Sequence, residues 1–182
     1  MTKLPPHDES SLFILETERL VLRRQIASDL EFLIGLWSDP EVTRHLGGPR
    51  DQAWLRSVFQ ETEDDPFGEE FDLWPVVEKA SGLPVGHCGL LPKAVDGEPE
   101  IELNYILSPG AWGKGYAKEI GAAIRDCAFH QMGLHRLIAL IDPANAASER
   151  VASSIGMHLE KESTRPDGAL RRVYAIETQS RP

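Results

Sequence analysis

The sequence predicts a single α/β domain of the α+β type, in which about four helices flank one mostly antiparallel sheet of about seven strands. Three observations predict this class. The chain has 182 residues, 41% of them hydrophobic and 26% charged, which suffices for one buried core. Segments of strand period are interleaved with segments of helical period. Neither a repeat nor a linker interrupts them, so we expect one domain at 16–182 after a flexible arm at 1–15.

Four segments are predicted as helices because apolar residues recur in them at helical spacing. Asp51 and Asn145 can cap two of these helices through their side-chain oxygens. Pro40 stops the first helix, and Gly156 can adopt the left-handed conformation that ends the fourth. The predicted helices cover residues 29–39, 51–59, 116–132 and 145–155.

Seven segments are predicted as strands because β-branched, aromatic and aliphatic residues alternate in them with polar ones or form short apolar runs. In the first of them, Leu20 and Leu22 share one face. Turn sequences at 79–82 and 165–168 join two pairs of strands as hairpins. The acidic run at 61–66 is expected to be a solvated loop. The predicted strands cover residues 17–23, 71–78, 83–91, 100–107, 135–141, 157–163 and 170–177.

The net charge of −10 limits the classes of partner. Nucleic-acid binding needs a basic surface, so no nucleic-acid partner is expected, whereas an acidic surface suits a cationic substrate such as an amine. Solubility explains the same charge equally well. No apolar run approaches the roughly 20 residues of a membrane span. Residues 1–10 lack the basic and apolar stretches of a signal peptide. We therefore expect a cytoplasmic protein without a membrane partner.

The cysteines and histidines do not form a recognisable metal site. Cys88 and Cys127 lack C-x-x-C spacing and are expected to be buried thiols. The six histidines are scattered, with no H-E-x-x-H, so no metal is expected. Three tryptophans, Trp37, Trp54 and Trp74, could line a substrate pocket, but core packing explains Trp37 and Trp54 equally well. His45 and His87 are expected to be hydrogen-bonded structural residues, and all five are left out of the predicted site.

The segment Leu107–Glu119 changes from strand period to helix period across Gly113 and Gly115. A loop in this position directs unpaired backbone N–H groups and the positive end of a helix dipole at one spot, which suits an anion. The glycines allow a phosphate to approach the backbone, and Lys114 adds a positive charge. G-x-G-x-x-G fails because Lys118 stands at its third glycine, and G-x-x-x-x-G-K-[ST] is absent. A plain strand-to-helix turn is the alternative.

Three landmarks resemble one family. Trp112–Ala117 fits [RQ]-x-x-G-x-[GA] except at its first residue, and resembles the pyrophosphate loop of the GNAT acetyltransferases, which receives acetyl-CoA. Leu134–Met157 resembles the family's strand, N-x-x-S-x-x-V and helix. Thr17–Arg23 resembles the opening strand of the branch that acetylates ribosomal-protein N-termini. The resemblance spans about residues 17–177, and it implies a GNAT-like sheet that splays at its fourth and fifth strands.

The resemblance implies a co-substrate site for acetyl-CoA, without a metal. Asn145 would contact the arm of this cofactor, although it can cap a helix whatever its function. Ser148 would lie near the thiol end, and a plain solvated helix position is its alternative. The implied cofactor-binding residues are Ile106, Leu107, Trp112, Gly113, Lys114, Gly115, Tyr116, Ala117, Asn145 and Ser148.

Acetyl transfer to an amine needs a base, because a lysine-like amine titrates near about 10.4 and a peptide N-terminus near about 8. Glu102 is the candidate, in a Glu-Leu-Asn-Tyr sequence that resembles the family's E-[IL]-G-Y. Glu100 shares its strand face, so the pattern does not separate the two, and both could be exposed carboxylates. The resemblance implies that a backbone N–H near Tyr105 to Leu107 would polarise the thioester carbonyl.

The departing thiolate is protonated in many members of the family by a tyrosine on the last helix. The matching residue here is Ala152. Ser148 or a water molecule would take this role, or the thiolate would leave unaided, since a thiol titrates near about 8.5. The candidate catalytic residues are therefore Glu102, Tyr105 and Ser148.

These inferences together predict an acetyl-CoA-dependent N-acetyltransferase that acts directly on a primary amine, without a covalent intermediate. The acceptor is either a protein N-terminal α-amine or a small-molecule amine, and ribosomal-protein N-termini, polyamines, aminoglycosides and amino acids all stay open. Two alternatives share the same loop. One uses another acyl-CoA such as succinyl-CoA, and the other is a non-catalytic CoA-binding sensor or interaction module. The family resemblance also allows a homodimer.

Overall fold

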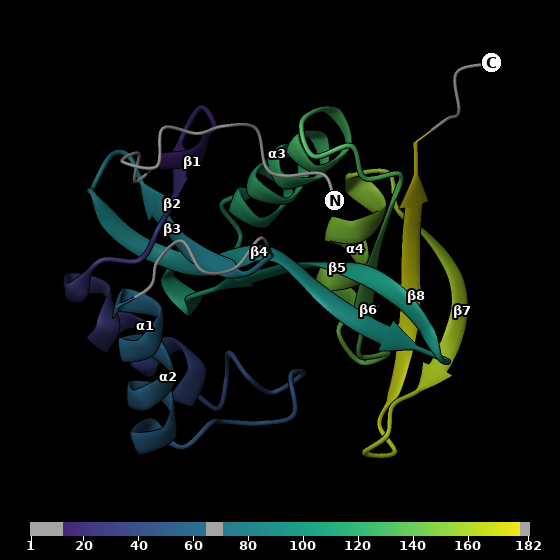
Figure 1. Cartoon of the computed structure of the whole chain (residues 1–182), viewed down its shortest axis with the longest axis horizontal. Coiled ribbons are helices and arrows are strands. Elements are labelled where there is room, and N and C mark those ends of the chain that lie inside the picture. The colour runs from purple at the N-terminus through teal and green to yellow at the C-terminus, as the bar shows by residue number, and fades with distance from the viewer. Residues whose placement is uncertain (1–12, 65–70, 179–182) are drawn as a thin grey trace.

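The backbone forms one eight-stranded sheet with the strand order β1-β2-β3-β4-β5-β6-β8-β7 (Figure 1). The structure is a computed structural model that describes residues 13–64 and 71–178. The strands are β1 (Phe13–Glu16), β2 (Leu20–Arg23), β3 (Leu73–Glu78), β4 (Leu83–Val95), β5 (Glu98–Leu107), β6 (Arg136–Ile141), β7 (His158–Thr164) and β8 (Leu170–Glu177). The helices are α1 (Leu30–Ser38), α2 (Gln52–Asp64), α3 (Tyr116–His130) and α4 (Ala146–Ser154), with short 3₁₀ turns η1 (Ala27–Asp29) and η2 (Pro109–Ala111).

Neighbouring strands are antiparallel except for β5 and β6, which α3 connects as a parallel crossover. These two strands pair only at Glu102 and Ile138, so they separate on either side of that point. They are the fourth and fifth of the seven strands predicted from the sequence, and the expected splay is confirmed. The separation opens the sheet where β5 runs into the glycine loop.

Helices cover both faces of the sheet (Figure 1). The side chains of Leu103 and Tyr105 point from β5 to the face that carries α3 and α4, where the main core contains Ile120 and Ile155. Ile106, on the opposite side of β5, packs with residues of α1 and its following loop. This alternation along one strand follows from its period of two. It places β5 between the two layers, with its end exposed to both.

Two boundaries differ from the sequence prediction. Phe13–Glu16, at the end of the arm expected at 1–15, pairs antiparallel with β2 as β1 and raises the strand count of the described residues from seven to eight. The rest of the arm, 1–12, lies outside the described residues. The acidic loop expected at 61–66 is helical up to Asp64, since α2 continues past Phe59. Residues 65 and 66 are outside the described part.

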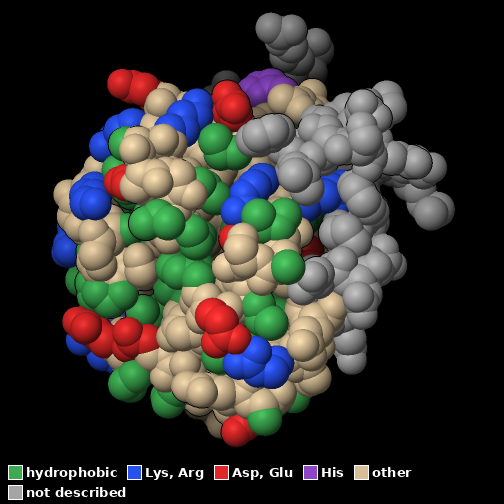
Figure 2. Space-filling model, turned by 90° about the vertical axis from the view of Figure 1, so that its left-hand side faces the viewer, with side chains coloured by type: hydrophobic (Ala, Val, Ile, Leu, Met, Phe, Trp, Pro, Cys, Tyr) green, Lys and Arg blue, Asp and Glu red, His purple; other side chains and the backbone are tan. Residues whose placement is uncertain are grey.

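The surface carries side chains of both signs. On the face shown in Figure 2, Lys, Arg, Asp and Glu side chains are interspersed around apolar ones. Cys88 and Cys127 are buried free thiols, as predicted. None of the helices in the described ranges is long and apolar enough to cross a membrane.

Candidate ligand-binding site

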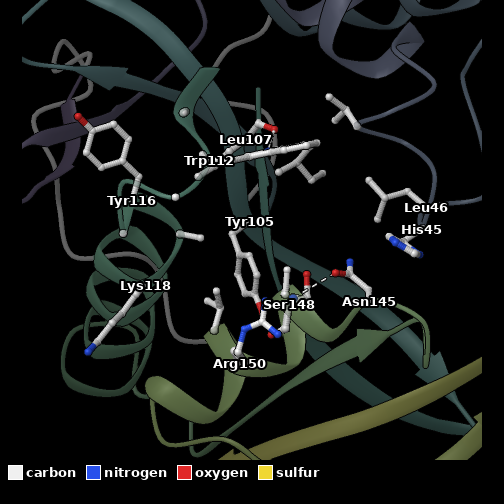
Figure 3. A pocket seen from close by; sticks show the side chains of 18 of the residues that line it. His45, Leu46, Tyr105, Leu107, Trp112, Tyr116, Lys118, Asn145, Ser148 and Arg150 are labelled. Carbon is white, nitrogen blue, oxygen red and sulfur yellow. Dashed lines mark hydrogen bonds between the residues drawn. The ribbon is translucent and has the colours of Figure 1, made fainter. Parts of the chain in front are cut away.

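A cavity of about 480 Å³ opens where β5 ends, bordered by the first turn of α3, by α4 and by the loop between α1 and α2 (Figure 3). It exists because β5 and β6 diverge beyond their single paired position. It brings together segments that lie far apart in the sequence. The predicted site residues that line it are Tyr105, Ile106, Leu107, Trp112, Gly113, Gly115, Tyr116, Ala117, Asn145 and Ser148.

The glycine loop takes a backbone form that favours glycine at two positions. Gly113 and Gly115 both take the left-handed conformation, with φ of 73° and 79°. Gly115 precedes the 15-residue helix α3. Among the described residues, the first N–H of this helix that has a backbone acceptor is that of Glu119, which donates to the Gly115 oxygen at 3.1 Å. The N–H groups before Glu119 are therefore open to a ligand. A Cβ at Gly113 would meet no atom within 4 Å, so the backbone is accessible there.

Positive side chains line the cavity from several elements. Lys118 stands in the first turn of α3, Arg150 on α4, and Arg44 in the loop between α1 and α2. Together with the open N–H groups of α3 they suit a ligand that carries several phosphate charges. The sequence motif predicted that Lys114 would supply a positive charge to this ligand. The Lys114 Nζ instead lies 3.6 Å from a carboxylate oxygen of Glu78, and Lys114 is not among the described residues that line the cavity.

Trp112 closes the end of β5. Its indole Nε1 donates to the Leu107 carbonyl at 2.8 Å, and the ring, 41% exposed, lines the cavity. In an extended strand the N–H and C=O of one residue point to the same side. The N–H of Leu107 is therefore directed toward the cavity with its carbonyl. It is a candidate for the backbone donor that the family resemblance implies near Tyr105 to Leu107.

Tyr105, Asn145 and Ser148 meet at the start of α4 (Figure 3). The Tyr105 hydroxyl donates to the backbone oxygen of Ser148 at 3.0 Å. Burial raises the pKa of Tyr105, so its hydroxyl stays protonated. The Asn145 Oδ1 accepts the Ser148 N–H at 3.1 Å and caps α4, as one of the two sequence interpretations expected.

The two carboxylates that the sequence left unresolved have different surroundings. Glu100 forms an ion pair with Arg136 at 3.1 Å. Glu102 is buried and accepts the Leu140 N–H at 3.4 Å, with the Lys93 Nζ at 4.0 Å. Burial raises the pKa of Glu102. Neither carboxylate lines the cavity as the described residues define it.

A cluster behind the loop ties it to the start of β2. The Arg19 side chain donates through Nη1 to the Lys114 oxygen at 2.9 Å and through Nε to Glu119 at 2.7 Å. The Thr17 hydroxyl donates to the same Glu119 carboxylate at 2.6 Å. The Arg19 guanidinium also lies over the Tyr116 ring, 4.7 Å from its centre. These contacts hold the loop against the residues that precede β2.

The loop between α1 and α2 contributes residues that the sequence did not assign to the site. His45 lines the cavity, and its Nδ1 lies 3.1 Å from Oδ2 of Asp142 at the end of β6. The N–H of Ala144 donates to the Asp142 carboxylate at 2.8 Å, and this bond is the main reason that the pKa of Asp142 is lowered. Helical spacing from Ser148 could have identified Val151 and Ser154, but no local pattern identifies His45.

Across the described ranges, no three metal-ligating side chains gather in one place.

The sequence matches known acetyltransferases. Residues 19–158 match the family model of the acetyltransferase (GNAT) domain. The uncharacterized protein YkkB of Bacillus subtilis is 34% identical over 148 residues, which are 81% of this chain and 86% of YkkB. The uncharacterized N-acetyltransferase p20 of Bacillus licheniformis is 30% identical over 166 residues, which are 88% of this chain and 92% of p20.

The fold matches solved structures. A GNAT-family acetyltransferase from Bacillus anthracis superimposes with a TM-score of 0.76 and 27% identity, covering 90% of this chain and 97% of that one. Spermidine N-acetyltransferase from Vibrio cholerae, solved with CoA and spermine, gives a TM-score of 0.71 at 18% identity, covering 88% and 96%. The latter likeness concerns the fold alone.

Proposed function

Because this chain belongs to the GNAT acetyltransferase family, we propose that it transfers an acetyl group from acetyl-CoA directly to a primary amine. The acceptor is a protein N-terminal α-amine or a small-molecule amine. The observation that carries the proposal is the loop with left-handed Gly113 and Gly115, which opens the N-terminus of α3 onto the cavity. The ribosomal-protein branch suggested by Thr17–Arg23 is one source of such acceptors.

The donor set fits the parts of acetyl-CoA. Its pyrophosphate would bind the open N–H groups at the start of α3, with Lys118 and Arg150 as further partners. Its arm would pass the polar side chains of Asn145 and Ser148. CoA bound to the Vibrio cholerae spermidine enzyme supports this choice of ligand. When bound, acetyl-CoA supplies a thioester whose carbonyl carbon is open to attack by an amine.

Residues of this chain would act on two atoms of the thioester, its carbonyl oxygen and its departing sulfur. The N–H of Leu107 would donate a hydrogen bond to the thioester carbonyl oxygen, where negative charge develops. Ala152, at the position of the family tyrosine, is fully buried and offers no proton. A proton for the departing sulfur would come from the Ser148 hydroxyl or from water, or the thiolate would leave unaided.

The cofactor is tested by thermal unfolding with and without acetyl-CoA. Ligand at about 100 times its Kd stabilises the folded state by about 2.7 kcal/mol, which raises Tm by about 5–10 °C for a chain of this size. Thiol release is then measured with a polyamine, an aminoglycoside, an amino acid and a short peptide. A Tm rise with thiol release supports the transferase. A rise without release from any amine indicates the CoA sensor, and a larger rise with succinyl-CoA indicates another acyl donor.

A pair of glycine variants shows whether the loop is the binding site. Gly115→Ala and Gly97→Ala both place a side chain on a left-handed residue, at a cost of about 1–2 kcal/mol each. Gly97 lies in the turn between β4 and β5 and does not line the cavity. We expect only Gly115→Ala to lose the Tm rise with acetyl-CoA. Equal responses of both variants would show that the loop is a structural turn.

A further inference from the structure

His45 is held in the cavity by a carboxylate. Its Nδ1 faces Oδ2 of Asp142 at 3.1 Å, and its side chain is only 17% exposed. Asp142 is fixed in turn, since its side chain accepts the N–H of Ala144 and its backbone oxygen accepts that of Asn145, both at 2.8 Å. A carboxylate on Nδ1 favours the tautomer with the proton there and leaves Nε2 as an acceptor. Nε2 makes no hydrogen bond to the residues described.

His45 lies at the end of the cavity where the chemistry would occur. Figure 3 shows His45 and Asn145 on one side of the cavity, with Tyr116 and Lys118 on the other. A cofactor anchored by its phosphates at the first turn of α3, with its arm passing Asn145 as proposed above, would cross the cavity from that turn. Its reactive end would then lie toward His45.

We propose that His45 is the general base that removes a proton from the acceptor amine, and that Asp142 is the positioning residue that orients it. This inference rests on the acetyl transfer proposed above. It replaces Glu102, the base suggested by the sequence, with a residue that lines the cavity.

The other candidate bases are less suitable. Glu102 is buried between the Leu140 N–H and Lys93 and does not line the cavity. The Tyr105 hydroxyl donates a hydrogen bond to the Ser148 oxygen, and burial raises the pKa of Tyr105. Glu41 lines the cavity but is exposed, and no described residue holds its carboxylate in a fixed orientation. Among the described lining residues, an imidazole is the side chain suited to exchange protons near neutrality.

The proposed step conserves atoms and charge. Nε2 of His45 takes one proton from the ammonium form of the acceptor, so the nitrogen gains the electron pair that forms the C–N bond. The C–S bond then breaks and sulfur leaves as a thiolate. The nitrogen loses a second proton, which ends on the sulfur through the Ser148 hydroxyl or water. His45 returns its proton to solvent.

Charged groups on several elements surround the imidazole. Asp142 faces it from β6, Glu41 and Arg44 belong to its own loop, and Arg150 lines the cavity from α4. Arg171 on β8 acts on Asp142 at longer range. The pH profile of the reaction therefore has to be assigned with variants.

The test compares His45→Gln, Asp142→Asn and Glu102→Gln with wild type. His158→Gln is the matched control, because His158 is exposed on β7 away from the cavity. For each protein, Tm is measured with and without acetyl-CoA, and kcat is measured by thiol release with saturating acetyl-CoA and amine between about pH 5.5 and pH 9.5, which spans the ordinary titration of histidines. The Tm rise reports folding and cofactor binding independently of turnover.

We expect His45→Gln to keep the Tm rise and to lose about 10²- to 10³-fold in kcat at pH 7. Its rate should climb steadily with pH, because only amine already neutral in solution reacts, whereas wild type levels off after a histidine-like inflection. Asp142→Asn should lose about tenfold or more in kcat with its Tm rise intact. Glu102→Gln should keep the wild-type inflection, and His158→Gln should match wild type throughout.

Two results overturn the assignment. A His45→Gln protein with the kcat and inflection of wild type excludes His45, and loss of the inflection in Glu102→Gln returns the role to Glu102. Both of these leave the transferase itself in place. A wild-type protein that releases no thiol with any amine instead removes the proposed function, and this inference with it.

Discussion

His87 shows how this fold keeps a buried histidine neutral. The indole Nε1 of Trp37 donates to its Nδ1 at 3.0 Å, and its Nε2 lies 2.9 Å from the Leu73 oxygen. A donor on one nitrogen and an acceptor on the other define the neutral tautomer. Burial lowers the pKa of His87 from 6.5 to about 4. Protonation would charge a side chain that has no water around it.

The stability of the protein should therefore depend on pH through His87. Between pH 6.5 and pH 4 the unfolded chain binds a proton at this histidine and the folded chain does not, so the free energy of unfolding falls with falling pH. The loss reaches about 3 kcal/mol near pH 4 and is absent above pH 6.5. Urea unfolding of wild type and His87→Gln at several pH values measures it.

The difference between the two proteins isolates this histidine. Glu102, whose pKa is raised, changes stability with the opposite sign, but it is present in both proteins and cancels. His87→Gln should be less stable than wild type at pH 7.5 and should show a flatter pH dependence below pH 6.5. Parallel curves over this range would mean that His87 titrates alike in the folded and unfolded states.

Sequence reasoning reached the residues whose roles are set by their neighbours in the chain. Gly113, Gly115 and Asn145 belong to local turns and caps, and all three line the cavity. His45 could not be reached in this way, because its partner Asp142 lies 97 residues further along the chain. Its place depends on how the loop between α1 and α2 folds back over β6.

The start of β2 and the start of α3 act as one unit through Arg19. The sequence predicts a continuous strand at 17–23, but Thr17 and Arg19 precede β2 and turn toward the glycine loop. The Arg19 contact to the Lys114 oxygen holds the loop, and Glu119 holds Arg19. A segment 100 residues away thus holds the backbone that is proposed to bind the ligand.

Removal of the Arg19 contacts should weaken ligand binding more than it lowers the stability of the fold. Arg19→Ala is expected to bind acetyl-CoA roughly tenfold less tightly, an effect of about 1.4 kcal/mol, because the loop is no longer held in its binding shape. Its Tm without ligand should fall only slightly, since the Arg19 side chain is 45% exposed and the ion pair is screened by solvent. Isothermal titration calorimetry and thermal unfolding measure the two effects.

Arg56→Ala is a matched control. Arg56 is also 45% exposed, and it pairs with Glu31 at 2.6 Å, the distance between Arg19 and Glu119. Neither Arg56 nor Glu31 lines the cavity. The Kd of Arg56→Ala for acetyl-CoA should equal that of wild type. If Arg56→Ala lost as much affinity as Arg19→Ala, the effect of Arg19 would be one of general stability.

The order and type of the main elements could be predicted because each carries its own period and end signals. β1 was missed because four residues, Phe13–Glu16, are too few to show a period and need β2 as a partner. The extension of α2 over acidic residues was missed for a related reason. Their composition favours a loop, but they continue a helix already begun at Gln52.

At the scale of the molecule, the sheet consists of two ladders. One contains β1 to β5 and the other contains β6, β8 and β7, and among the described residues strand pairing joins them only at Glu102 and Ile138. We expect amide hydrogen exchange to show two units, with β6 and β8 opening while β3 and β4 stay protected. Saturating acetyl-CoA should slow exchange most in β6 and β8. Equal protection of both ladders without ligand would show that they open together.

The cavity lies at the junction between these two ladders, lined by β5 on one side and by the start of α4 on the other. A ligand bound there joins the two parts of the sheet and adds its binding free energy to the cost of separating them. Proteolysis of the carboxyl-terminal third should then slow as the cofactor becomes abundant. The lifetime of the protein in a cell would in this way follow the local supply of acetyl-CoA.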